Sequence, residues 1–236
     1  MSTSANPDHM LLGMHFGNGF GAQPHAWRAD GVSVDSFTDF DVQVRHAQAV
    51  ERGLFDFLFL PDFLHLQADL DHEPSMLTLA AVARATERIG LVTTASTSYN
   101  DAYTLARQFK TLDVMSHGRA GWNAVPSSGE ATAANYGRPA LGRTEKYERL
   151  HEMVQVVQDL WGSWGEDAFI GDQSSGRFAD AAQVQPIGMQ GRHVGSRGPL
   201  PIPPSAQGQP VIFQAGGGGN GLQVAGRYAN GVIGAV

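Results

Sequence analysis

The chain has 236 residues, a formal net charge of −7 and no cysteine. The acidic balance argues against nucleic-acid or anionic-membrane binding, and the lack of cysteine excludes disulfides, thiolate catalysis and cysteine-ligated zinc. Hydrophobic residues make up 42% of the chain and glycine occurs 29 times, which is typical of a globular, turn-rich enzyme domain. We see no signal peptide and no apolar run of roughly 18 residues, so we expect a cytoplasmic protein.

Six apolar runs of strand length follow one another along the chain. They lie at 11–16, 55–60, 89–96, 120–125, 210–216 and 231–236. Several of them are apolar throughout, which is typical of a parallel sheet that is covered on both faces.

Amphipathic helices are predicted between these runs, because apolar residues recur at steps of three and four. Ser36 or Thr38 is the expected cap of the first helix, Pro74 and Ser75 open the second, and Gly118 ends the third. The four apolar faces consist of Phe40, Val44, Ala47 and Val50; Met76, Leu79, Ala80 and Ala83; Leu105, Phe109, Leu112 and Met115; and Leu150, Met153, Val157, Leu160 and Trp161.

The alternation of strands and helices leaves two architectures open. One is an open doubly wound sheet, which suits six strands; the other is a (β/α)₈ barrel, which would lack its last two strand–helix units. Residues 162–209 show little periodicity and far exceed a usual connection of about 2–6 residues. We interpret them as an inserted lobe within a single domain, 1–236, and expect this lobe to cover the barrel mouth.

A glycine-rich run, GGGGNG, occupies 216–221 between a predicted strand and a short predicted helix. Backbone N–H groups at a helix N-terminus bind phosphate well, so the run is a candidate phosphate-binding turn. It also satisfies the G-x-G-x-x-G pattern of nicotinamide-binding folds. That motif needs an acidic residue about 20 residues further on, which this chain does not provide.

Candidate ligand-binding residues follow three of the predicted strands. Asp62 and Asn123 are placed where ligands bind in parallel α/β proteins, at the carboxyl ends of strands. His15, after the first strand, is a candidate catalytic histidine, with a structural core histidine as the alternative. The acidic, histidine-containing loop 62–73 matches no metal-binding pattern, so no metal site is predicted.

Five stretches carry a specific pattern in combination. They are FDFLFLPD (55–62), TASTSYNDAYTLARQFKTLDVMSHGRAGWNAV (94–125), KYERLHEMVQVVQDLW (146–161), GPLPIPPSAQGQPVIFQAG (198–216) and the helix that follows. Together they resemble the bacterial-luciferase-like flavin-dependent monooxygenases, within them the branch of nitrilotriacetate and dibenzothiophene-sulfone monooxygenases. The resemblance covers nearly the whole chain from Leu11.

The resemblance implies an α/β fold of the (β/α)₈ TIM-barrel type that binds reduced FMN at its carboxyl mouth. A separate NAD(P)H:flavin reductase would supply the reduced flavin. O₂, the co-substrate, would add to the flavin as a peroxide that oxygenates a small organic sulfur, amine or aminocarboxylate compound. The protein would position the flavin and keep water away from it.

Site residues follow from the resemblance by position. Asp62, Ser98 and Asn123 would contact the isoalloxazine or its surroundings. Tyr147, with the Gly217–Gly218 turn, would hold the ribityl phosphate. Arg143 stands where the family usually has a histidine, and it would pair with phosphate at least as well.

Three departures from the family pattern accompany these matches. Pro126 replaces a threonine and so removes a hydroxyl and an N–H, and the phosphate turn is all glycine. Family members also continue through two more strands, so the resemblance implies a barrel truncated after the sixth strand. We expect such a chain to be poorly stable alone or to form a homo-oligomer through its unpaired edges.

Two other functional classes remain open from the sequence. One is a flavin-binding remnant without turnover, which would retain flavin but oxidise no substrate. The other is a nicotinamide- or deazaflavin-dependent oxidoreductase on the same barrel, which would consume reduced nicotinamide without a partner reductase.

Overall fold

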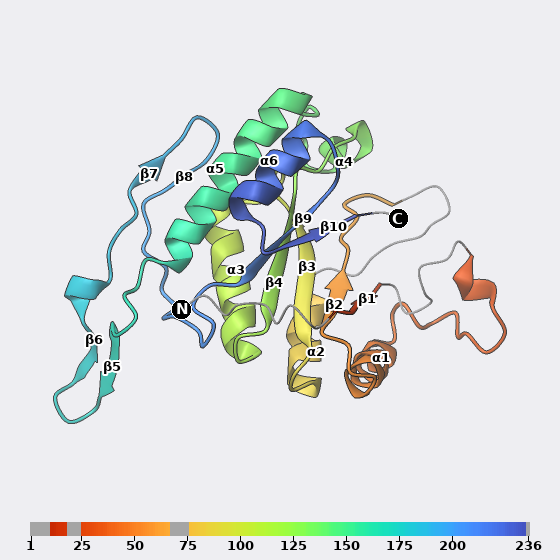
Figure 1. Ribbon diagram of the computed structural model, residues 1–236, viewed down its shortest axis with the longest axis horizontal. Helices are drawn as coiled ribbons and strands as arrows, with labels where there is room; N and C mark the ends of the chain where they lie inside the picture. Colours follow the sequence, from red (N-terminus) through yellow and green to blue (C-terminus); the bar gives the residue numbers. More distant parts are fainter. Residues whose placement is uncertain (1–9, 18–24, 67–75, 235–236) are drawn as a thin grey trace.

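The computed structural model describes residues 10–17, 25–66 and 76–234 (Figure 1). Its main sheet has six parallel strands in the order β1-β2-β3-β4-β9-β10. The strands are β1 (Gly13–His15), β2 (Phe57–Leu60), β3 (Gly90–Ser96), β4 (Ala120–Val125), β9 (Val211–Ala215) and β10 (Gly231–Ile233). The six predicted strands and their parallel arrangement are therefore confirmed.

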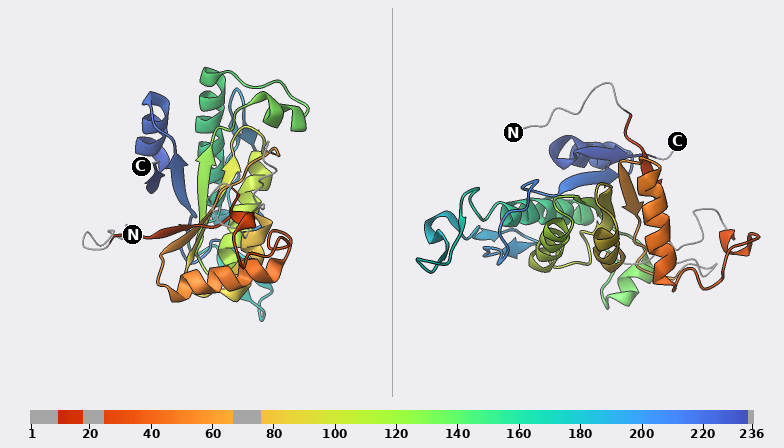
Figure 2. Two further views of the ribbon diagram at one scale, coloured as in Figure 1. Left: turned by 90° about the vertical axis from the view of Figure 1, so that its right-hand side faces the viewer. Right: turned by 90° about the horizontal axis from the view of Figure 1, so that it is seen from below.

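The strand order follows the chain without a reversal, whereas a doubly wound sheet reverses its order once. The doubly wound alternative is therefore wrong for this chain. The strands instead form a curved parallel sheet, with β1 and β10 at its edges among the described residues (Figure 2).

Helices connect the strands and cover the outer side of the curved sheet (Figures 1 and 2). They are α1 (Phe40–Arg52), α2 (Leu77–Ala85), α3 (Ala102–Met115), α5 (Arg143–Trp161) and α6 (Gly219–Tyr228). The short α4 (Glu130–Asn135) instead bonds to residues 64 and 65 beyond β2. The longest, α5, packs on α3 and β4 and buries every residue of its predicted apolar face. None of the helices in the described part of the chain is long and apolar enough to cross a membrane.

Three aromatic rings form the centre of the core between the sheet and its helices. Phe109, Trp122 and Trp161 contact one another with ring centroids 5.8 to 6.3 Å apart. Each indole N–H donates to a backbone carbonyl, that of Trp122 to Ala95 and that of Trp161 to Ala106. Burying these rings removes large apolar surfaces from water without leaving a polar atom unpaired. The rings therefore fix the position of α3 and α5 against β4.

Two local expectations about α1 are wrong. The cap is Asp39, whose carboxylate accepts from the N–H of Asp41, because the hydroxyl of Thr38 donates instead to the Asp35 carbonyl. Phe40, expected on the buried face, is exposed, and Val42 takes its place in the core.

The end of α3 also differs in part from expectation. Met115 is exposed, because the helix ends there and the chain turns away through Gly118, which has the expected positive φ of 84°. The first three residues of the predicted stripe, from Leu105 to Leu112, are buried.

The inner face of the sheet combines aromatic rings with glycines. A Cβ on Gly13 or Gly231 would collide with the rings of Phe57 and Phe213, respectively. These two rings contact each other across the sheet, with centroids 5.2 Å apart. The glycines thus leave room for two rings on the inner face of the sheet.

Residues 162–209 lie beside the helices. They contain two hairpins, β5 (Phe169–Asp172) with β6 (Arg177–Ala179) and β7 (Met189–Gln190) with β8 (Gly195–Ser196). β8 packs on α3 and α5, and the β5–β6 hairpin extends past the carboxyl end of α5 (Figure 1). This position differs from the expected cover over the mouth, because Trp164 and Ser163 bond to Leu200 and so fold the segment back along the helices.

Candidate active site at the carboxyl ends of the strands

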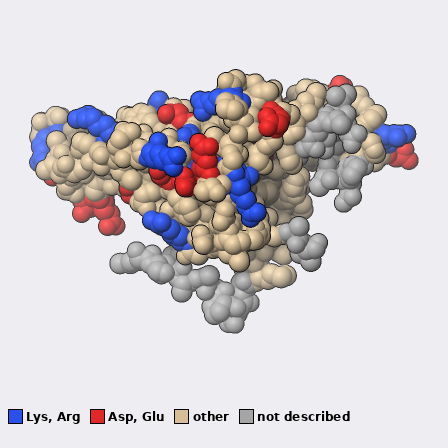
Figure 3. All heavy atoms as spheres, turned by 90° about the horizontal axis from the view of Figure 1, so that it is seen from above, with Lys and Arg blue, Asp and Glu red and all other residues tan. Residues whose placement is uncertain are grey.

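Most candidate residues gather at one end of the sheet, where the strands finish and α5 and α6 begin. Figure 3 views the molecule from this side and shows basic and acidic side chains intermixed. In parallel α/β folds this end collects the loops that contact ligands. Within the described residues no group of three metal-ligating side chains occurs, while Asp69, Asp71, His72 and Glu73 of the acidic loop lie outside them.

Asn123 is the most informative side chain of the inner face. It is 2% exposed, and its amide nitrogen donates to the hydroxyl oxygen of Thr94 on the neighbouring strand at 2.8 Å. Its amide oxygen is buried with no hydrogen-bond partner in the described part of the chain. A buried acceptor left unpaired costs roughly 1–3 kcal/mol. This oxygen is therefore suited to accept an N–H from a ligand on the concave face.

Ser98 follows β3 and is also buried. Its hydroxyl donates to the Ser127 carbonyl at 3.2 Å, and its N–H donates to the hydroxyl of Ser96 at 3.1 Å. Because the hydroxyl proton is used within the protein, the Ser98 oxygen is left as an acceptor for a ligand donor.

Arg143 and the glycine turn are brought together by the starts of α5 and α6. Gly216 and Gly218 have positive φ values of 115° and 87°, and Gly218 is the N-cap of α6 without a side-chain cap. A Cβ on Gly218 would lie 3.8 Å from a guanidinium nitrogen of Arg143, and Gly217 faces open space. Uncapped helix N–H groups beside a guanidinium bind phosphate through charge-assisted hydrogen bonds. The structure thus brings the two predicted phosphate contacts side by side.

Tyr147 lies one helical turn after Arg143 and packs, partly buried, against the core cluster of α3 and α5. The Lys146 ammonium lies 5.9 Å from its ring centroid. Its position on the same helix as Arg143 is compatible with the predicted phosphate role.

His15 is at the end of β1, where its side chain is exposed on the inner face rather than buried in the core. It pairs in register with Phe59, so it lies nearer the amino ends of the strands than Asn123 does. Its catalytic role remains a prediction.

Asp62 lies two residues beyond β2 in a partly buried position. Burial raises the pKa of its carboxyl to about 6. The pKa of the Tyr136 hydroxyl is also raised, first by burial and second by the charge of the nearby Asp62. The ring of Tyr136 stacks on that of Tyr99, with centroids 4.6 Å apart. A carboxylate with a raised pKa beside a stacked tyrosine pair is a suitable group for proton exchange with a ligand.

No sequence pattern predicted the tyrosine pair or α4, the helix that precedes Tyr136. The helix is fixed by contacts across the mouth, because the Thr132 hydroxyl bonds to His65 at 2.8 Å and the Asn135 amide donates to the Leu64 carbonyl. Such contacts join residues about 70 positions apart, and no local periodicity reports them.

Residues 13–236 match the model of the luciferase-like monooxygenase family. The chain belongs to this family. The luciferase-like resemblance and the expected branch are thereby confirmed, since nitrilotriacetate and dibenzothiophene-sulfone monooxygenases are among the relatives. Several of the relatives are named as monooxygenases.

Individual relatives agree with this assignment. The chain is 41% identical over 219 residues to N-acetyl-S-(2-succino)cysteine monooxygenase of Bacillus subtilis (strain 168), which covers 89% of this chain and 49% of that protein. It is 37% identical over 237 residues to component A of nitrilotriacetate monooxygenase of Aminobacter aminovorans, covering 93% and 51%. A crystal structure of riboflavin lyase with modified FMN and riboflavin superimposes with a TM-score of 0.87 at 30% identity, covering 94% and 53%. The chain thus spans about half the length of these proteins.

Proposed function

We propose that this luciferase-like chain binds reduced FMN at the carboxyl ends of its strands and takes part in the oxygenation of a small organic sulfur, amine or aminocarboxylate compound. The curvature of the sheet favours a place within a (β/α)₈ barrel. One relative is component A of its enzyme, which supports supply of the reduced flavin by a separate reductase. The names of the relatives support this substrate class, because they include sulfur and aminocarboxylate compounds.

The observation that carries the proposal is the anion site beside α6. Arg143 and the uncapped N-terminus of that helix present a guanidinium and backbone N–H groups to one point. A ribityl phosphate fits this donor set, because both kinds of donor form strong bonds with phosphate oxygens.

The unpaired amide oxygen of Asn123 is the second observation that fits a flavin. The isoalloxazine ring carries an N–H donor at its pyrimidine edge, and a bond from it would satisfy this buried oxygen. Reduced FMN would supply the reaction with O₂, while the protein holds the ring, limits water access and offers Asp62 for proton exchange.

The first experiment is an anaerobic titration of the chain with reduced FMN and, separately, with reduced riboflavin, followed by fluorescence. The two ligands differ only in the phosphate. We expect saturable binding and a preference for FMN of roughly 10- to 100-fold, as two to three charge-assisted bonds would give.

Two substitutions make the test specific. Arg143→Gln should reduce the preference for FMN and leave riboflavin affinity nearly unchanged, whereas Asn123→Ala should weaken both ligands equally. Equal affinity of the unsubstituted chain for both flavins would contradict the phosphate assignment. Mixing the reduced complex with O₂ and substrate then tests turnover, and flavin retention without substrate oxidation would indicate binding alone.

A further inference from the structure

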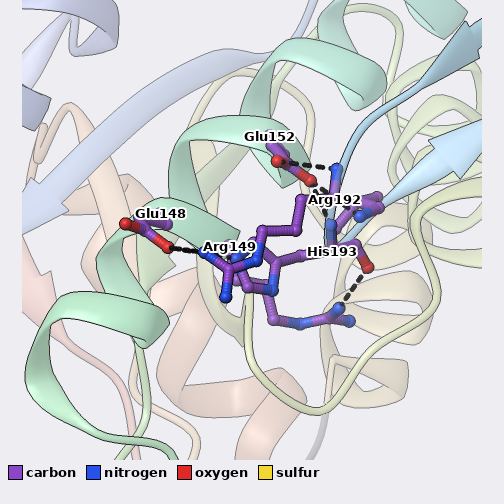
Figure 4. A network of polar contacts seen from close by, with 6 residues as sticks. Glu148, Arg149, Glu152, Arg192 and His193 are labelled. Carbon is purple, nitrogen blue, oxygen red and sulfur yellow. Dashed lines mark hydrogen bonds and ion pairs between the residues drawn. The ribbon is translucent and has the colours of Figure 1, made fainter.

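Arg149, in the middle of α5, joins two turns that are far apart in the sequence. Its guanidinium donates to the carbonyls of Thr97 and Asn100 at 3.0 and 3.1 Å, and to the His193 carbonyl at 2.9 Å. The first two carbonyls flank Ser98, and the third lies in the turn between β7 and β8. Figure 4 shows this side chain reaching from α5 to the turn.

The β7–β8 turn, residues 191–194, is itself held firmly on α5. The carboxylate of Glu152 accepts three successive backbone N–H groups, from Arg192, His193 and Val194, at 2.6 to 3.0 Å (Figure 4). Burial alone would raise the pKa of Glu152, but the three N–H donors outweigh it and hold the pKa below its ordinary value. The turn is therefore a rigid support for the third bond of Arg149.

Gly191 makes this close approach possible. A Cβ at this position would lie 2.9 Å from the Val194 carbonyl oxygen and would also meet the Glu152 carboxylate. Since such spacing forces a shift in the turn, the absence of a side chain is required here.

Besides the bonds from Arg149, the turn that carries Ser98 is held by bonds of its own: the Thr97 N–H and hydroxyl donate to the Val125 carbonyl, and the Asn100 amide donates to the Ser96 carbonyl. The Ser96 hydroxyl accepts the N–H groups of Ser98 and Tyr99 at 3.1 and 3.3 Å. Two carbonyls of this turn point at the guanidinium. They would be left without a donor if Arg149 were removed, and a buried unpaired carbonyl is costly.

We propose that Arg149 is a positioning residue of the candidate flavin site, which sets Ser98 by tying the 97–100 turn to the 191–194 turn. The inserted segment 162–209 thereby supports the mouth from the side, through one hairpin turn. This inference rests on the proposed flavin function, because it concerns the same site.

Arg119 offers a matched control at the opposite end of the strands. It too is partly buried and donates to backbone carbonyls, those of Ala83, Thr86, Ile89 and Ser116. These carbonyls lie at the amino ends of the strands, away from the candidate site. Arg119→Gln therefore removes the same kind of bonding without touching the 97–100 turn.

The experiment compares Arg149→Gln and Arg119→Gln with the unsubstituted chain by thermal unfolding, reduced-FMN titration and amide hydrogen exchange. We expect both variants to unfold at lower temperature. Only Arg149→Gln should raise the dissociation constant for reduced FMN, by roughly tenfold, which corresponds to about 1.4 kcal/mol. Only this variant should speed exchange of the Ser98 and Tyr99 amides relative to the rest of the chain.

Two further variants test the role of the 191–194 turn. Glu152→Gln should act in the same direction as Arg149→Gln, and the two should be less than additive in a double-mutant cycle, because they belong to one chain of contacts. Arg192→Gln removes an exposed side chain of the same turn, 3.4 Å from Glu148. It should change neither the dissociation constant for reduced FMN nor the exchange of the Ser98 and Tyr99 amides.

The outcomes separate the two proposals. Unchanged FMN affinity and unchanged exchange of Ser98 and Tyr99 in Arg149→Gln would overturn the positioning role, as would an equal loss of affinity in Arg119→Gln. If the unsubstituted chain does not bind reduced FMN, the proposed function fails. Hydrogen exchange would then still decide whether Arg149 positions the 97–100 turn.

Discussion

Substituting Asp62 with asparagine should make the chain more stable while weakening its ligand binding. The carboxyl has a pKa raised from 3.8 to about 6 by burial, and no cation of the described residues offsets that cost. A rise of this size corresponds to about 3 kcal/mol at neutral pH. Because the side chain is partly exposed, solvent screening reduces the expected gain to about 1–2 kcal/mol for Asp62→Asn.

The direction of the pH dependence follows from the same shift. Between pH 4 and 6 the folded chain binds more protons than the unfolded chain at this residue, because the folded pKa is the higher one. The free energy of unfolding should therefore fall as pH rises through this range and stay low above it. In Asp62→Asn this contribution disappears, so the stability of the two forms should converge at about pH 4.

Urea unfolding at pH 4, 5, 6 and 7, followed by tryptophan fluorescence, measures both effects. Asp62→Leu is unsuitable as a control, since it adds apolar area; Asp101→Asn, at an exposed helix cap, shows the effect of a generic charge loss. A lower stability of Asp62→Asn at pH 7, or an equal difference from the unsubstituted chain at pH 4 and pH 7, would refute the reasoning.

Three other substitutions have expected outcomes. Asp113→Ala should lower the free energy of unfolding by roughly 3–5 kcal/mol in urea, because the fully buried carboxylate bonds to Ser205 and Gln207 and offsets the buried charge of Lys110. Gly218→Ala, at a φ of 87°, should cost about 1–2 kcal/mol and reduce the preference for FMN over riboflavin; an unchanged preference would contradict the anion site. Glu51→Gln should lower the free energy of unfolding at neutral pH and by less as pH falls, because three backbone N–H donors outweigh burial and hold the pKa of this carboxyl below its ordinary value, and the benefit is lost as pH falls through that lowered pKa.

The parts of the fold that the sequence predicted are those with a repeating local signal. The apolar face of α5 was predicted in full, because residues such as Leu150 and Val157 recur at the helical period and all meet one core. The capping of α1 was not, because Thr38 and Asp39 are both suitable caps and a contact to Asp35 decides between them.

The candidate site likewise has features that a local sequence pattern predicts and features that only distant contacts determine. The glycine turn was recognisable because positive φ favours glycine, and Gly216 and Gly218, which have positive φ, occur in a run of glycines. The partners of Arg149 and Tyr136 were not, because a single arginine or tyrosine in the sequence does not indicate which distant carbonyl or ring it meets. The hairpins of 162–209 were missed because their strands are too short for an alternation to be visible.

The polar side chains at the two ends of the sheet differ in how fully their hydrogen bonds and charges are satisfied, and this difference matters for engineering the chain. At the amino ends, Arg119, Glu51 and Asp113 have their hydrogen bonds satisfied within the protein. At the carboxyl ends, Asn123 keeps an oxygen without a partner among the described residues, and no cation of these residues compensates the Asp62 carboxyl. Libraries that vary the carboxyl end should therefore retain a high fraction of folded members, whereas the same number of changes at the amino end should yield few.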